Sequence, residues 1–261
     1  MMQTETLALG DTVVRVAGAG APLVFIHGFT TTAEFWREQV AHFSASHRVV
    51  LINLPGHGAA PRPAQRAYTI AAFVADVNAV FDALALDGAT LVGLSMGGTV
   101  AQQFVLDHPG RVRALVLVGA TPHGLGPDVD ADNVLAAIES LGVVAASQRV
   151  IERSFGSAAS AALLAFAREE VAQTPAFVAR QAIASLNAAD SRARLGEITV
   201  PTLAIVGEED IITPVCESEA LADGIPGCGL ALIPQAGHFP MLEQPAAFNR
   251  VLAAFLAQRA R

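Results

Sequence analysis

Residues 90–98 read Thr-Leu-Val-Gly-Leu-Ser-Met-Gly-Gly, and this stretch decides the fold. Its first three residues form a short apolar run typical of a buried strand, while Met96–His108 has the apolar spacing of a helix. Ser95 therefore lies on the turn between a strand and a helix. A nucleophile at such a sharp turn occupies strained backbone and needs small neighbours, which Gly93 and Gly97 provide. The stretch predicts a nucleophilic serine at position 95.

Other short apolar runs, rich in Val and Ile, lie on both sides of this turn. The predicted strands are two within Leu7–Val16 and one each at Leu23–Ile26, Val49–Ile52, Ala114–Val118, Thr202–Val206 and Leu230–Ile233. The predicted helices of this region are Ile70–Leu86, Met96–His108 and the segment from Pro245 to the C-terminus. Such runs suit strands that are covered on both faces. Their alternation with helices predicts an α/β fold with a mostly parallel sheet and helices on both faces.

The segment 121–189 interrupts this alternation. It is rich in Ala, contains no clear strand, and spaces Val134, Leu135, Ile138 and Leu141 as in a helix. We therefore predict a helical cap over residues 121–189. The core domain is expected to consist of residues 1–120 and 190–261.

The composition excludes several functions. All sixteen basic residues are Arg, so a Schiff-base lysine, a lysine-linked pyridoxal phosphate and a Walker A loop are ruled out. A formal net charge of −8 argues against a nucleic-acid partner, which would need a basic face. Cys216 and Cys228 fit neither a disulfide framework nor a metal site, and no other metal-ligand spacing is present. We expect no cofactor and no metal.

The protein is expected to be cytoplasmic and to have no membrane partner. No apolar run is long enough to span a bilayer. The first residues contain polar Gln3, Thr4 and Glu5 where a signal peptide would be apolar.

A serine hydroxyl needs a base within hydrogen-bond reach to act as a nucleophile near neutral pH. Asp210 and His238 each follow one of the last two predicted strands, which deliver them to the carboxyl edge of the sheet. We predict that His238 is the general base and that Asp210 orients its ring. His27 and His57 also lie on turns after strands, and we interpret them as structural support. Glu208 and Glu209, beside Asp210, are expected to be solvated.

The third predicted component is an oxyanion hole. One donor is expected to be the backbone N–H of Met96, directly after the nucleophile, and the other that of Phe29, in the loop after Leu23–Ile26. We expect the side chains of Phe29, Met96 and Phe239 to contact the substrate. The cap phenylalanines Phe155, Phe166 and Phe177 are expected to lie mostly in the core, with some lining the pocket.

Five motifs together resemble the α/β-hydrolase superfamily over nearly the whole chain. They are His27-Gly28, Gly56-His57-Gly58, Gly93–Gly98, Gly207–Asp210 and Gly237-His238. The resemblance implies an eight-stranded sheet with an antiparallel second strand, a helical cap inserted after the sixth strand, and a triad in the order Ser, Asp, His. Within the superfamily, Gly93–Gly98 and Leu195–Pro201 are similar to bacterial serine carboxylesterases and 3-oxoadipate enol-lactonases.

Departures from other branches narrow the predicted activity. Dehalogenases and epoxide hydrolases of this fold use Asp as nucleophile, whereas this chain has Ser95. Carbon–carbon bond hydrolases usually have Asn where this chain has Leu94, which counts against them. We expect a hydrolase that forms an acyl-enzyme from a carboxylic ester or lactone of a small, largely apolar substrate.

Three alternatives stay open from the sequence. They are an enol-lactonase acting on an anionic lactone, a carbon–carbon bond hydrolase, and a receptor-like member of the fold that binds a ligand and scarcely turns it over. An anionic substrate should meet one of the arginines in or beside the cap. The arginines available are Arg149, Arg153, Arg168, Arg180, Arg192 and Arg194. A homodimer is also left open.

Overall fold

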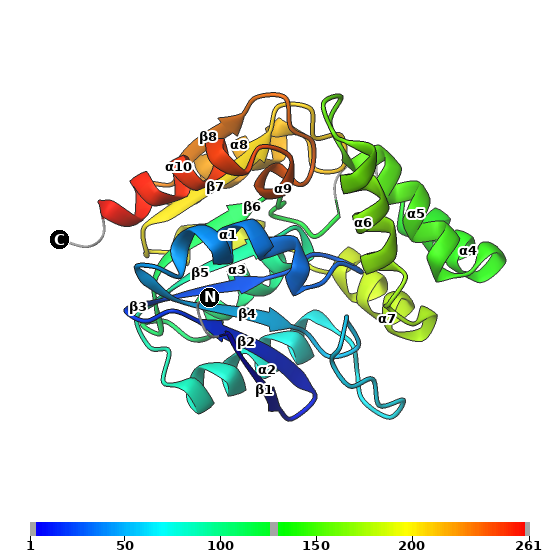
Figure 1. The fold of residues 1–261 in the computed structure, drawn as a ribbon, viewed down its shortest axis with the longest axis horizontal. Helices are drawn as coiled ribbons and strands as arrows, with labels where there is room; N and C mark the ends of the chain where they lie inside the picture. Colours follow the sequence, from blue (N-terminus) through cyan, green and yellow to red (C-terminus); the bar gives the residue numbers. More distant parts are fainter. Residues whose placement is uncertain (1–3, 126–129, 259–261) are drawn as a thin grey trace.

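An eight-stranded sheet forms the centre of the molecule in the computed structural model, which describes residues 4–125 and 130–258 (Figure 1). The strands are β1 Thr4–Leu9, β2 Thr12–Ala17, β3 Ala21–Ile26, β4 His47–Asn53, β5 Ala89–Leu94, β6 Val112–Val118, β7 Thr202–Gly207 and β8 Gly229–Ile233. Their order across the sheet is β1-β2-β4-β3-β5-β6-β7-β8. β2 runs antiparallel to both β1 and β4, and all the other neighbours are parallel. The predicted fold class is confirmed.

Helices cover both faces of the sheet, because successive side chains of a strand point to opposite faces. Val24 and Ile26 of β3 pack into one apolar cluster, and Leu23 and Phe25 of the same strand pack into the other. The first cluster contains side chains of α2 Ile70–Leu84, α3 Met96–Asp107 and α8 Val215–Gly224. The second contains side chains of η1 Ala33–Trp36, α1 Arg37–Phe43, α9 Pro240–Glu243 and α10 Pro245–Ala257.

The cap lies between β6 and β7, and its described part contains helices and connecting loops but no strand. Its helices are α4 Ala131–Leu141, α5 Val143–Ser154, α6 Ala161–Val171 and α7 Ala176–Asn187, and the short helix η2 Arg192–Glu197 leads back to the core. Asp130 and Ser160 begin α4 and α6 by accepting backbone N–H groups of the first turn. Figure 1 shows the four cap helices together at one end of the sheet.

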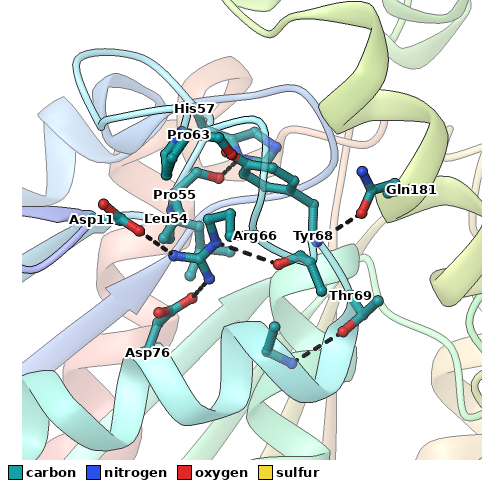
Figure 2. A network of polar contacts seen from close by, with 12 residues as sticks. Asp11, Leu54, Pro55, His57, Pro63, Arg66, Tyr68, Thr69, Asp76 and Gln181 are labelled. Atoms are coloured by element: carbon teal, nitrogen blue, oxygen red, sulfur yellow. Dashed lines mark hydrogen bonds and ion pairs between the residues drawn. The ribbon is translucent and has the colours of Figure 1, made fainter.

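A polar network holds the long loop between β4 and α2 (Figure 2). The Arg66 guanidinium bridges Asp11 and Asp76 at 3.2 and 2.6 Å. The Tyr68 hydroxyl donates to the Pro63 carbonyl, and the Tyr68 N–H donates to Gln181 of α7. The loop is therefore fixed to the first hairpin, to α2 and to the cap.

Within the described residues, no helix has both the length and the apolar character needed to cross a membrane.

Candidate active site

Ser95 occupies the turn between β5 and α3 in strained backbone, with φ 50° and ψ −116°. A Cβ atom on Gly93 would lie 2.3 Å from the Gly97 carbonyl oxygen, and one on Gly97 would lie 2.4 Å from that of His27. The Ser95 N–H donates to the Val118 carbonyl at 2.9 Å, which ties the turn to β6. The glycines thus allow the backbone to approach itself closely enough to project Ser95 at the strand edge.

Asp210 and His238 meet at the carboxyl edge of the sheet, after β7 and β8. His238 Nδ1 lies 2.8 Å from Asp210 Oδ2, and both side chains are buried. Asp210 also accepts the backbone N–H groups of Ile212 and Thr213, each at 2.9 Å, and the Thr213 hydroxyl at 2.8 Å. The loop that follows β7 therefore fixes the orientation of the Asp210 carboxylate independently of its contact with the imidazole.

These contacts keep Asp210 ionised despite its burial. Burial alone would raise the pKa of Asp210, but the charge of His238 and the hydrogen bonds from His238 and Thr213 outweigh it and lower the pKa. An ionised acid beside Nδ1 holds the proton on that nitrogen and leaves Nε2 of the ring free to accept one.

The loop that begins at His27 lies against the nucleophile turn and is held by buried contacts. His27 Nε2 accepts the Leu54 N–H at 3.1 Å, so its proton lies on Nδ1, 2.8 Å from the Gly28 carbonyl oxygen. The Thr31 hydroxyl donates to the same carbonyl. Among the described residues, no hydrogen bond is made by the N–H of Phe29 or of Met96. Both N–H groups are available to a ligand.

His57 is fully buried against the ring of His27, with the two ring centroids 4.8 Å apart. Its Nδ1 donates to the Pro55 carbonyl at 3.1 Å. Burial lowers the pKa of His57 from 6.5 to about 4, so the ring is neutral at physiological pH. His57 does not line the pocket described below, and its surroundings are those of a support for the loop.

Ser95 and His238 line one pocket beneath the cap, a cavity of about 70 Å³. Phe29 and Phe239 line it from the core. The cap contributes two serines, Ser147 and Ser154, and otherwise mainly aliphatic side chains, which are Leu125, Val134, Ile138, Val150, Ile151, Ile183 and Leu186. Over residues 4–125 and 130–258, the lining contains no Arg, Asp or Glu. The pocket therefore suits a small neutral group.

A model of the alpha/beta hydrolase family matches residues 23–251. The chain belongs to the alpha/beta hydrolase family. It is 31% identical over 270 residues to the 2-hydroxymuconate semialdehyde hydrolase of a Pseudomonas species, with 97% of this chain and 93% of the relative covered. It is 28% identical over 259 residues to 3-oxoadipate enol-lactonase 2 of Acinetobacter baylyi, with 97% and 96% covered. An esterase from Exiguobacterium antarcticum superposes with a TM-score of 0.89 at 25% identity, covering 98% and 100%.

These likenesses confirm the resemblance drawn from the five motifs, and they show that this alpha/beta hydrolase is an enzyme.

The structure does not agree with the sequence prediction about the side chains that face the pocket. Met96 is fully buried in the core and is not among the lining residues, so its side chain does not face the pocket. Phe155 packs on Phe239, Phe166 on Phe35, and Phe177 on Tyr68. No phenylalanine of the described cap lines the pocket, because the faces of the cap helices that line it carry aliphatic residues.

The arginines in and beside the cap lie away from the pocket of the hydrolase. Arg168, Arg180, Arg192 and Arg194 form ion pairs with carboxylates outside the pocket. Arg149 and Arg153 are exposed on α5. No arginine within the described part of the cap contacts the space above Ser95.

Sequence reasoning did not predict the contacts that three residues make near the site. Thr213 contacts both Asp210 and, at 3.1 Å, His238 Nδ1. Glu209 was expected to be solvated, but it is half-buried and accepts the N–H and hydroxyl of Ser157 in the cap. Glu243 accepts three backbone N–H groups around His238. Of these three residues, only Thr213 could have been predicted from the sequence, because its hydroxyl lies three residues after Asp210.

Among the residues described, no group of three or more His, Cys, Asp or Glu side chains could hold a metal ion.

Proposed function

We propose that this alpha/beta hydrolase cleaves the carboxylic ester or lactone bond of a small, uncharged substrate through an acyl-enzyme on Ser95. One observation carries the proposal. The strained Ser95 and His238, which is paired with the buried Asp210, line the same apolar pocket, and within the described residues that lining contains no Arg, Asp or Glu. The homology to an enol-lactonase and an esterase supports this class of bond.

The proposed reaction begins with attack by Ser95 Oγ on the substrate carbonyl carbon, while His238 Nε2 takes the hydroxyl proton. The carbonyl oxygen becomes an oxyanion, which the N–H groups of Met96 and Phe29 would stabilise by about 3–4 kcal/mol each. His238 then gives the proton to the departing alkoxide, and the acyl-enzyme remains. Water then attacks the acyl carbon while His238 takes its proton. The bond between the acyl carbon and Ser95 Oγ breaks, His238 returns the proton to Oγ, and the carboxylic acid leaves.

The pocket favours a neutral acyl group over an anionic one. A carboxylate in a cavity lined by aliphatic side chains would lose its hydration without gaining a cationic partner. Each Å² of apolar substrate surface buried there contributes about 25 cal/mol. The anionic enol-lactone alternative is disfavoured on this ground. A carbon–carbon bond hydrolase is favoured by the 31% identity to the semialdehyde hydrolase but opposed by Leu94 and the uncharged lining.

Labelling with an organophosphonate tests the nucleophile. We expect the wild type to be modified at Ser95 alone, with complete loss of esterase activity, and Ser95→Ala to be unlabelled and inactive while keeping its fold. Peptide mapping by mass spectrometry locates the label, and circular dichroism checks the fold. Labelling elsewhere, or an active Ser95→Ala variant, would contradict the assignment of the triad.

A substrate panel tests the acyl group. We expect p-nitrophenyl esters with acyl chains of a few carbons to give the highest kcat/KM, because the cavity is small and apolar. An anionic enol-lactone and a ring-fission dienoate, the latter cleaved at a carbon–carbon bond, serve as comparisons. Selective turnover of either anion would reject the proposal. Binding of the esters without steady turnover would instead support the receptor-like alternative.

A further inference from the structure

The turn that carries His238 has all three of its backbone N–H groups bound by fixed partners. The N–H groups of Gly237 and Phe239 both donate to Glu243 Oε1, at 3.0 and 3.1 Å. The His238 N–H donates to the carbonyl of Ser154, at the end of cap helix α5, at 2.7 Å. The base is therefore held by one carboxylate and by the cap.

Glu243 also reaches the cap directly. Its second oxygen, Oε2, accepts the N–H of Gly156 at 2.7 Å. Gly156 and Gly237 lie so close that a Cβ on Gly237 would be 2.6 Å from the Gly156 nitrogen and 2.5 Å from the Ser154 oxygen. The backbone of the cap and that of the base turn are thus in direct contact, with the Glu243 carboxylate spanning both.

We propose that Glu243 is a positioning residue: by accepting the N–H groups of Gly237 and Phe239 together with that of Gly156, its carboxylate holds the turn 237–239 in place and sets the position of the His238 ring. The inference rests on the proposed role of His238 as the base. The bonds of Glu243 to the turn set the ring position, and its bond to the cap fixes the carboxylate.

A second carboxylate provides a matched control. Glu209 accepts the N–H of Ser157, the next cap residue after Gly156, at 2.6 Å, and its hydroxyl at 3.0 Å. Its side chain anchors the same cap segment from the loop after β7 and, within residues 4–125 and 130–258, makes no hydrogen bond to the turn 237–239. If both carboxylates only anchored the cap, variants of Glu209 and Glu243 should therefore lose activity equally.

The test compares Glu243→Gln with Glu209→Gln in the whole chain. The amide introduced by Glu243→Gln has one acceptor oxygen in place of two, so it must turn its NH₂ group toward one of the bound N–H groups. We expect kcat for p-nitrophenyl acetate, and the rate constant of phosphonylation by a methylphosphonate, to fall about 10- to 100-fold, as for a catalytic group displaced by about 1 Å. KM should change less than about threefold, because the pocket lining is intact. For Glu209→Gln, kcat should stay within about twofold of wild type.

Two results would overturn the inference. One is phosphonylation of Glu243→Gln at the wild-type rate, and the other is an equal loss of kcat in Glu209→Gln. If Glu243→Gln does not fold, as judged by its thermal transition, Glu243→Asp takes its place, since the shorter carboxylate cannot span both partners and the same loss is expected. Ser95→Ala in the same labelling assay separates the two proposals: rapid labelling of that variant would refute the triad, whereas an unlabelled Ser95→Ala beside an unaffected Glu243→Gln would refute only the role of Glu243.

Discussion

At the scale of single residues, the acid of the site is fixed more firmly than the serine. Asp210 receives four hydrogen bonds, three of them from Ile212 and Thr213 in its own loop and one from His238. Ser95, by contrast, is held through its backbone and makes no side-chain hydrogen bond among the described residues. This division suits a nucleophile whose hydroxyl must be free to react and an acid that must stay in place.

Asp210→Asn tests the orienting role. The amide would donate to Nδ1 or leave it unpaired, which favours the tautomer with the proton on Nε2, and we expect kcat to fall on the order of 10⁴-fold. Steady-state kinetics of purified Asp210→Asn measures the loss. Asp223→Asn, at an exposed position of α8, is the control and should match the wild type. An active Asp210→Asn would assign the role to another carboxylate.

At the scale of elements, the strands and helices of the core were predictable because their burial follows from local apolar patterns. Each predicted strand lies within an observed one, and the helix predicted over Ile70–Leu86 ends at Leu84, where Ala85 takes a left-handed conformation that apolar spacing does not reveal. The strand β3 begins at Ala21, earlier than its apolar run, because pairing with β4 extends through Pro22.

The site could be predicted only for reactive side chains that directly follow a predicted strand. Ser95, Asp210 and His238 follow strands of one sheet, so their approach to the same edge was implied by the topology. The contact between Glu243, at the end of α9, and Gly156, in the loop after α5, joins residues 87 positions apart. No periodicity encodes such a contact. The aliphatic pocket wall likewise depends on how α4, α5 and α7 rotate against the core, which the sequence of the cap does not specify.

At the scale of the whole molecule, the cap is bound to the core next to each loop of the proposed site. The Thr32 hydroxyl donates to Glu170 of α6, and the Thr174 hydroxyl donates to the Thr30 carbonyl. Ser157 of the cap donates to Glu209 in the loop after β7, Gly156 donates to Glu243 of α9, and the Ser154 carbonyl accepts the N–H of His238. These contacts attach the cap to the core at several points around the pocket.

The buried histidines make the stability of the whole protein depend on pH. Below about pH 6.5 the unfolded chain binds a proton on His57, whereas the folded protein does not until its pKa of about 4 is reached. Stability is therefore full above pH 6.5 and is lost as pH falls toward 4, by about 3 kcal/mol from this residue. Burial also lowers the pKa of His27, which acts in the same direction.

Urea unfolding at pH 7.5 and 4.5 measures this effect. We expect the free energy of unfolding of His57→Phe to fall less between the two pH values than that of wild type, because one buried neutral imidazole has been removed. His42→Gln, at an exposed position, should keep the wild-type dependence. An unchanged pH dependence in His57→Phe would show that His57 does not contribute to acid denaturation.

At position 95, stability favours a residue without backbone strain, whereas the proposed activity requires the serine hydroxyl. Glycine would adopt φ 50° and ψ −116° without the cost of about 1–3 kcal/mol that such a conformation carries for other residues. It would also remove the proposed nucleophile. An engineering campaign that screens this enzyme for heat resistance alone would therefore enrich catalytically dead proteins at position 95, and any stabilisation of the protein has to be selected together with turnover.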